Sequence, residues 1–147
     1  MRNKKKFSIL LFSILLILAL GTGYYLYHKP GTLNSFLLNN YNKENIEQIE
    51  IRSTLSRQDK SIKDKDKINE ILANVSNIKL VRHYGSTTDK TKGAIHIFIY
   101  DKSKITTEII IQGKEYINII NDYDNSNKEY KIIDNSLDLD YINRLIS

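Results

Sequence analysis

Residues 94–121 read AIHIFIYDKSKITTEIIIQGKEYINIIN, and the fold class follows from the pattern of apolar side chains in this segment. Apolar and polar side chains alternate through AIHIFIY (94–100), which is the period of a strand with one buried face. Two further β-rich runs follow, ITTEIIIQ (105–112) and YINIIN (116–121), and polar or glycine-containing turns separate the three. The stretch therefore predicts three antiparallel strands in a meander.

The alternation also predicts which side chains face the core. In the first strand the core face carries Ile95, Ile97 and Ile99, and the opposite face carries the other side chains of the run: His96, Phe98 and Tyr100. In the second strand we expect four side chains to face the core together: Ile105, Thr107, Ile109 and Ile111.

More strands are expected on both sides of this meander. IEQIEIRSTL (46–55) places Ile49 and Ile51 on one face and charged residues on the other. The remaining strand predictions are short segments: 60–63, 78–84 and, after a polar loop at 121–129, YKIID at 130–134.

Two helices are predicted from apolar stripes at helical spacing. DKDKINEILANVS (64–76) begins after an N-cap at Asp64, ends at Asn77 and has a stripe made of Ile68, Ile71, Leu72 and Val75. The second helix closes the chain at about 136–146, with Asn135 or Ser136 as its cap and a stripe made of Leu139, Ile142, Leu145 and Ile146.

The order of these elements is strand, strand, helix, strand meander, helix. Helices grouped around an antiparallel sheet define an α+β domain, which we place at residues 46–147. About 100 residues can bury one core without disulfides or metals.

The N-terminal segment has a different character. Residues 7–27, FSILLFSILLILALGTGYYLY, contain no charge, and 21 helical residues extend about 31 Å, close to the thickness of a bilayer core. Basic residues precede the run and tyrosines end it, which predicts a transmembrane helix with a cytoplasmic N-terminus. These residues are Arg2, Lys4, Lys5 and Lys6 on one side, and Tyr24, Tyr25 and Tyr27 on the other.

A cleaved signal peptide is the alternative, since small residues in Ala19-Leu20-Gly21 could form a cleavage site. An uncleaved anchor is favoured because the apolar run continues through 24–27. We therefore divide the chain into a basic tip with an anchor (1–29), a juxtamembrane tether (30–45) and the extracytoplasmic domain (46–147). The tether is either a flexible spacer or a short helix with one apolar face, formed by Leu33, Phe36, Leu37 and Tyr41.

The net charge of +5 belongs to the N-terminus. Residues 1–29 hold five basic residues and no acid, which leaves 17 basic and 17 acidic residues in 30–147. Basic and acidic residues also alternate along KSIKDKDK (60–67). Because affinity for nucleic acid depends on an excess of Lys and Arg, we expect no nucleic-acid binding.

The inventory of catalytic groups is small. The chain has no cysteine and three histidines, of which His28 belongs to the membrane exit. His83 with Asp89 could act as a general base, and His96 lies on a strand, but no nucleophile motif accompanies them. Their spacing is not that of a zinc site. We therefore predict no catalytic residue, no metal ligand and no cofactor, and expect that the protein is not an enzyme.

Two weaker patterns are interpreted as structural. Asp122, Asp124 and Ser126 resemble the start of a calcium loop, but Asn127 and Ile133 occupy the places of its glycine and glutamate. Four tyrosines could form a stacking surface, yet tyrosine is also a common strand residue. These are Tyr100, Tyr116, Tyr123 and Tyr130.

The layout as a whole resembles a group of known proteins. An apolar N-terminal segment is followed by IEQIEI, the helix DKDKINEILANV, the strands IKLVR, AIHIFIY and TEIIIQ, and the ending YKIIDNSLDLDYINRLI. This order is similar to small membrane-tethered or lipoprotein domains of unknown function from low-GC Gram-positive bacteria. The resemblance covers residues 45–147 and implies no catalytic residues. The absence of a lipobox cysteine favours a protein anchor over a lipid anchor.

The sequence thus favours a single-pass cell-membrane protein whose extracytoplasmic domain is not enzymatic and binds a protein or an envelope component. An immunity or inhibitor protein that protects the cell from a secreted toxin or enzyme is the alternative. A hydrolase that uses His83 or His96 is a third reading and is disfavoured, because no nucleophile or partner motif accompanies either histidine.

Overall fold

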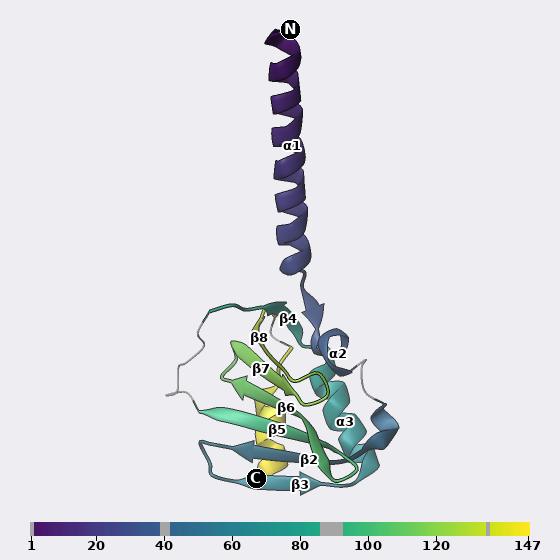
Figure 1. The fold of residues 1–147 in the computed structure, drawn as a ribbon. Helices are drawn as coiled ribbons and strands as arrows, with labels where there is room; N and C mark the ends of the chain where they lie inside the picture. The colour runs from purple at the N-terminus through teal and green to yellow at the C-terminus, as the bar shows by residue number, and fades with distance from the viewer. Residues whose placement is uncertain (1, 39–41, 86–92, 135) are drawn as a thin grey trace.

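The computed structural model describes residues 2–38, 42–85, 93–134 and 136–147 (Figure 1). Within these ranges the side chains of 2–9, 26 and 43 are outside the description.

An antiparallel sheet of eight strands forms the body of the protein. Neighbouring strands follow the order β1-β4-β8-β7-β6-β5-β2-β3. The bounds are β1 (Gly31–Thr32), β2 (Ile46–Ser53), β3 (Asp59–Ile62), β4 (Lys79–Arg82), β5 (Ala94–Asp101), β6 (Lys104–Gln112), β7 (Tyr116–Asn121) and β8 (Ser126–Ile132). The predicted α+β class with an antiparallel sheet is therefore confirmed, as is the meander of β5, β6 and β7.

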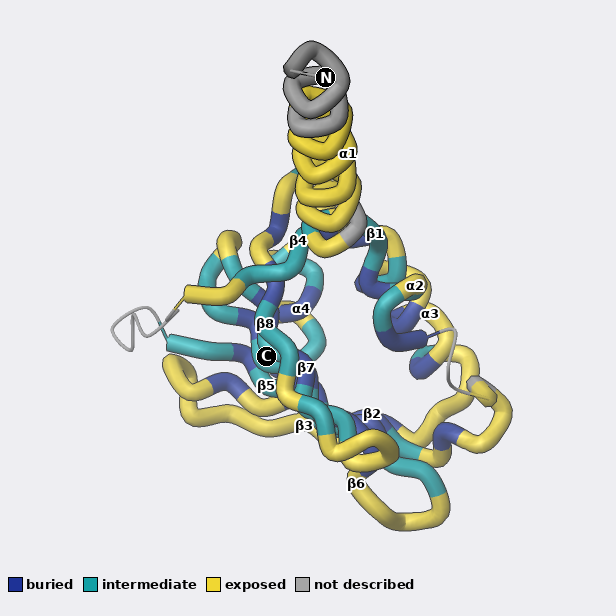
Figure 2. Tube along the Cα trace, turned by 45° about the horizontal axis from the view of Figure 1, so that its top comes forward, coloured by how far each residue is buried: buried dark blue, intermediate teal, exposed yellow. Residues whose placement is uncertain are grey.

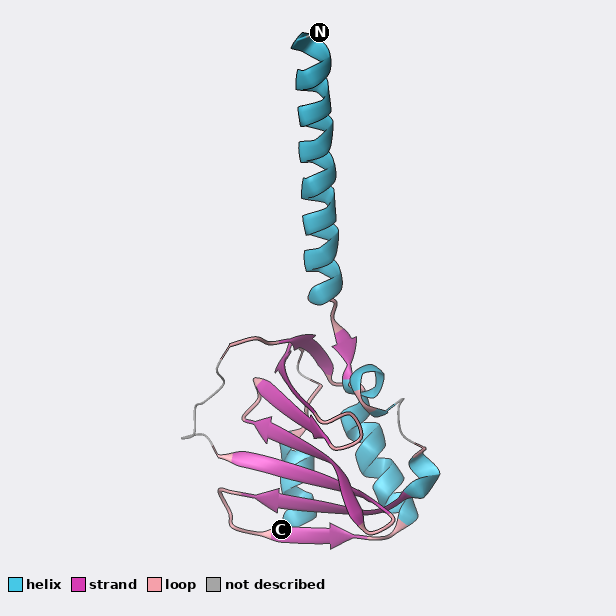
Figure 3. Ribbon diagram, in the orientation of Figure 1, coloured by secondary structure: helices cyan, strands magenta, loops and turns pink. Residues whose placement is uncertain are grey.

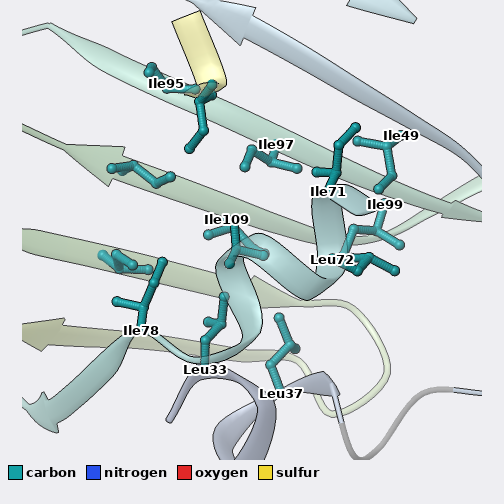
Figure 4. Close-up of a cluster of buried hydrophobic side chains, with 14 of the residues drawn as sticks. Leu33, Leu37, Ile49, Ile71, Leu72, Ile78, Ile95, Ile97, Ile99 and Ile109 are labelled. Carbon is teal, nitrogen blue, oxygen red and sulfur yellow. The ribbon is translucent and has the colours of Figure 1, made fainter. Parts of the chain in front are cut away.

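The helices of this domain lie on one face of the sheet (Figures 1 and 3). They are α2 (Leu33–Phe36), α3 (Lys65–Ser76) and α4 (Leu139–Ile146), and the 3-10 turn η2 (Lys43–Asn45) precedes β2. The apolar side chains of α3 and α4 belong to the same core as those of the strands (Figure 4). The sheet consequently has a covered face and an open face.

The covered face is built from isoleucine rows that run across the strands. One row joins Ile51, Ile97, Ile109 and Ile119 through β2, β5, β6 and β7, and each is at most 3% exposed. Full burial of one such side chain contributes about 1.5–3 kcal/mol. The alternation in the sequence is thus the source of the core.

Helix α3 agrees with its prediction in both boundaries and face. The Asp64 side chain accepts a hydrogen bond from the backbone N–H of Lys67 at 2.8 Å, and Asn77 is the C-cap. The four stripe residues are buried: Ile68, Ile71, Leu72 and Val75.

Two predicted boundaries near the C-terminus are wrong. Strand β8 begins at Ser126 and not at 130, because its polar residues lie on solvent-accessible positions of the sheet and do not prevent pairing with β7. Helix α4 begins at Leu139, and Asp138 is its cap. Ser136 instead donates its hydroxyl to Asp134 at 2.6 Å. Asn135 lies outside the described residues. Of the predicted stripe, two residues are buried and Leu139 and Leu145 are half-buried.

The predicted face of Ile105 is also wrong. Ile105 pairs with Tyr100, whereas Thr107 pairs with Ile99, so Thr106 is an extra residue in β6. Such a bulge moves every side chain before it to the other face. Ile105 is consequently 38% exposed, while the other three predicted core residues of the strand are buried.

The segment expected to be a tether packs against the domain. Strand β1 pairs with β4, and the backbone N–H of Leu33 donates to the carbonyl of Ile78 at 3.0 Å. Leu33, Leu37 and Leu38 are at most 1% exposed. The short helix predicted on this segment is present as α2, with Phe36 half-buried, whereas Tyr41 lies outside the described residues.

A single long helix, α1 (Arg2–Tyr27), precedes the domain and projects away from it (Figure 1). Among the residues whose side chains are described, which in α1 are 10–25 and 27, no helix is long and apolar enough to cross a membrane. The helix over residues 7–27 is therefore observed, and its passage through a bilayer is taken up below as a proposal.

The buried stripe of α3 can be tested with two substitutions that add a carboxylate. Ile71 is 1% exposed, so Ile71→Asp buries a charge without a partner, which costs several kcal/mol and is comparable to the whole stability of about 5–15 kcal/mol. Asn74 is exposed on the same helix, so Asn74→Asp should stay within about 0.5 kcal/mol of the parent. Urea unfolding followed by circular dichroism measures both, and equal losses would contradict the assigned face.

Candidate functional site

The open face of the sheet carries two continuous cross-strand rows of side chains. One row is Glu50, Phe98, Glu108, Ile120 and Asn127, and the other is Arg52, His96, Ile110, Asn118 and Glu129. Eight of these ten residues are half-buried because the side chains shield one another, whereas Arg52 and Asn127 are exposed. Figure 2 shows the central strands largely in the colours of buried and half-buried residues. The face mixes aromatic, aliphatic and charged groups without a covering helix.

A charged cluster occupies the β2–β5 side of this face. Arg52 donates to Glu50 Oε1 at 2.7 Å, and the Tyr100 hydroxyl donates to Glu50 Oε2 at 2.9 Å. The guanidinium carbon of Arg52 also lies 5.2 Å from the centre of the Phe98 ring, which is a cation–π distance. Each group of the cluster thus has its charge or ring partnered.

The hydrogen bonds of this cluster shift two acid–base equilibria in opposite directions. The bond from Arg52, followed by the bond from Tyr100, lowers the pKa of Glu50 below its ordinary value. Burial and the bond to Glu50 raise the pKa of Tyr100. Glu50 is therefore ionised and Tyr100 neutral at physiological pH, which keeps the Tyr100 hydroxyl a donor.

His96 and Glu108 form a second polar pair on the open face. The imidazole Nδ1 lies 2.6 Å from Glu108 Oε1, and both side chains are about three-quarters buried, at 24% and 22% exposure. Among the described residues this is the only hydrogen bond of the His96 ring, so no hydroxyl is activated by it. In the described part of the chain this pair has no hydroxyl beside the imidazole that would complete a hydrolytic triad.

Two amides on this face have acceptor atoms without donors. Gln112 Oε1 and Asn118 Oδ1 are inaccessible to solvent and have no hydrogen-bond partner among the residues that the structure describes. An unsatisfied buried polar atom costs about 1–3 kcal/mol. These two acceptors are adjacent to the apolar side chains Ile110 and Tyr116 in the cross-strand rows.

A separate groove of about 770 Å³ lies where α1 meets the domain. Its cationic lining consists of Lys29, Arg82 and Lys128, and its aromatic lining consists of Tyr27, Phe36, Tyr84 and Tyr130; the other lining residues are Pro30, Gly31 and Ser35. Among the described residues that line the groove there is no carboxylate. This volume is within the range of ligand pockets, about 300–1,000 Å³.

Arg82 is fixed between two rings in this groove. Its guanidinium carbon lies 5.3 Å from the centre of the Tyr130 ring and 5.5 Å from that of Tyr84. Arg82 Nη1 is inaccessible to solvent and has no hydrogen-bond partner among the described residues. Tyr84 stacks on Tyr27 at 4.5 Å between centroids, which connects the wall of the groove to the end of α1.

A smaller cavity of about 220 Å³ lies at the opposite end of the molecule, lined by Glu47, Gln48, Lys63, Tyr100 and Ser103. The Ser103 backbone N–H donates to Glu47 Oε2 at 3.2 Å. The polar groups of this cavity belong to the β2–β5 bulge and the β5–β6 turn. They stabilise these two connections, and we do not assign a ligand to the cavity.

The residues singled out in the sequence do not converge on one site. His83 lies after β4 with its ring 5.1 Å from that of Tyr116, and Asp89 is outside the described residues. Asp124 accepts from the Ser126 backbone at 3.1 Å and pairs with Lys128 at 3.5 Å. No cluster of three or more metal-binding side chains occurs in the described part of the chain.

The four tyrosines are likewise distributed over different surfaces. Tyr100 and Tyr116 lie on the open face, Tyr130 is 4% exposed on the covered side, and Tyr123 donates to Asp101 at 2.8 Å in the β7–β8 turn. The sequence reading missed the groove, because its cations come from three distant segments. The sequence feature that could have indicated the groove is the presence of two basic residues, Arg82 and Lys128, within predicted or observed strands.

Comparisons with known proteins identify no relative. No protein-family model, no curated protein and no solved structure matches this chain.

The Glu50 cluster predicts a measurable titration. Replacing Arg52 with Ala should raise the pKa of Glu50 towards its ordinary value, because the hydrogen bond that lowers it most is lost. Tyr100→Phe should raise it less. The side-chain carbonyl shift of Glu50, followed by NMR from neutral to acid pH, measures both. Arg57→Asn is the control, since it removes a cation from the neighbouring turn at a positive φ of 55° that Asn tolerates. A Glu50 titration unchanged by Arg52→Ala would contradict the geometry.

Proposed function

We propose that this protein is a single-pass membrane protein with a cytoplasmic N-terminus, whose extracytoplasmic domain is not an enzyme and binds a protein partner through the open face of its sheet. The observation that carries the proposal is the open face itself. Its aromatic and aliphatic side chains, its partnered charges and its unpaired amide acceptors occupy the one side of the sheet that no described helix covers.

The membrane part of the proposal is supported by the chemistry of α1. The large apolar side chains of its described part are exposed on all sides, for example Phe12 at 69% and Ile17 at 68%. An apolar surface of this extent is unfavourable in water and is typical of a segment that contacts a membrane or another protein. The uncharged run of residues 7–27, with four basic residues before it, matches a bilayer and the positive-inside rule.

The binding part is supported by the composition of the open face. Protein interfaces are enriched in aromatic residues and arginine, and Phe98, Tyr100, Tyr116 and Arg52 supply them here. Gln112 and Asn118 are half-buried on this face, and their side-chain amides are groups that bond to the N–H and C=O groups of a polypeptide partner. The partner is therefore a protein that presents apolar side chains together with hydrogen-bond donors.

The orientation can be tested because the chain has no cysteine and therefore no labelling background. Asn143→Cys, on the exposed side of α4, should react with a membrane-impermeant maleimide on intact cells. Asn3→Cys should react only after the membrane is permeabilised. Labelling of Asn3→Cys alone on intact cells would reverse the topology, and labelling of neither variant until permeabilisation would place the domain inside.

The partner surface can be tested by photo-cross-linking in the native membrane. A photoreactive residue at position 118, on the open face, should form one discrete adduct with another protein. The same residue at position 143, another exposed asparagine site, should form none. Ile110→Lys places a charge beside position 118 and should abolish the adduct.

Identical adducts at both positions, or none from position 118, would contradict the assignment of the open face. A cross-linked partner that is a secreted toxin or hydrolase would identify the immunity or inhibitor role.

A further inference from the structure

The groove between α1 and the domain has a composition that the fold alone does not explain. Arg82 pairs with Tyr130, and Lys128 pairs with Ile119, so register places both cations on the covered face of the sheet. In the central strands β5, β6 and β7 the same two rows consist of buried isoleucines: Ile95, Ile111 and Ile117 in the row of Arg82, and Ile97, Ile109 and Ile119 in the row of Lys128. Cations at positions that the strand period assigns to a core indicate a constraint other than folding.

The positive charge of the groove is only partly neutralised. Lys128 has a long ion pair with Asp124 at 3.5 Å, in which both side chains are about half exposed, at 43% and 52%. Arg82 and Lys29 have no carboxylate partner among the described residues, and no carboxylate lines the groove. Burial and the neighbouring Tyr27 raise the pKa of Tyr84, so this ring adds no negative charge.

The position of the groove restricts what can reach it. Tyr27 is the last residue of α1 and lines the groove, and its ring stacks on Tyr84 of the domain. If α1 crosses the membrane as proposed above, the groove lies at the level of the lipid headgroups. Tyrosine rings and cations at this level are the residues that contact headgroups.

We propose that this groove binds the headgroup of an anionic phospholipid, with Arg82 and Lys29 on the phosphate and the tyrosine rings along its glycerol and upper acyl carbons. The proposal rests on the membrane anchoring proposed above. Arg82 lines the groove, and a guanidinium donates to phosphate oxygens in the paired geometry that Arg favours. The aromatic wall accounts for the choice of a lipid over a small hydrophilic anion.

The test uses the full chain in lipid nanodiscs made of phosphatidylcholine, with phosphatidylglycerol increased from none to about one-third of the lipid. The readouts are the NMR shifts of the Arg82 side-chain Nε–H and the Tyr84 amide. In the parent protein both shifts should saturate as the anionic fraction rises. In Arg82→Gln the Tyr84 shift should reach half-saturation at about fivefold more anionic lipid than in the parent. One cation near a charged membrane surface contributes an affinity difference of about this size.

Lys29→Gln is the second variant, because Lys29 is exposed and its loss leaves the core intact. It should also weaken the response about fivefold. Arg52→Gln, on the open face, is the matched control and should leave the response unchanged. An equal dependence in the parent, Arg82→Gln and Lys29→Gln, or an equal loss in Arg52→Gln, would overturn the site.

Free inorganic phosphate and glycerol phosphate, added to nanodiscs without anionic lipid, separate a lipid from a soluble anion. Saturation of the same shifts by either anion at lower concentration than the lipid would overturn the lipid assignment. Co-elution of the chain with nanodiscs but no response to phosphatidylglycerol would overturn the groove and leave the anchor intact. A chain that co-elutes with no nanodisc would overturn the anchor and the lipid site together.

Discussion

The structure depends on the one-sided burial of a sheet whose strands alternate. Isoleucine occupies every second position in the central strands, so register assembles rows such as Ile51, Ile97, Ile109 and Ile119 on one face. The helices supply only enough apolar surface to cover that face, with four stripe residues from α3 and two buried ones from α4. The opposite face must therefore remain compatible with water, and its charges are partnered by neighbours in the sheet. This division places a mixed, half-buried surface on the side away from the helices.

The same constraint explains where the groove can form. The core ends at Phe36 and Tyr130, whose rings lie 4.8 Å apart between centroids. Beyond them no described helix covers β4 and β8, so core-facing positions on these strands are open to solvent beside the end of α1. Arg82 occupies one such position, where its guanidinium lies between the rings of Tyr84 and Tyr130. Gly31 allows this packing, since an added Cβ would come within 2.7 Å of the Phe36 ring.

The elements that could be predicted are those in which one local pattern decides the outcome. The stripe and caps of α3 and the faces of β2 and β5 follow from spacing alone. Where pairing decides, the prediction was wrong: the bulge at Thr106 reverses Ile105, and β8 extends over polar residues because β7 is available as a partner. The groove could not be predicted from the sequence, since Lys29, Arg82 and Lys128 become neighbours only through the strand order β1-β4-β8. The sequence shows that His96 and Glu108 lie on neighbouring strands, but it does not show that they pair, because this depends on the register between β5 and β6.

The two surfaces lie at different distances from the end of α1, and this separation determines how they can interact. Between β4, which borders the groove, and β2, which carries Glu50 and Arg52, the sheet order has five intervals of about 4.8 Å, or roughly 24 Å. The screening length at physiological salt is about 8 Å. With α1 in a membrane, the charge of the lipid surface acts on Arg82 and Lys29 but is screened at the Glu50 cluster. Because the two surfaces also face opposite sides of the sheet, a bound headgroup leaves the open face free. The two proposed sites, the groove and the open face, are therefore separate, and a ligand in one leaves the contacts of the other unchanged.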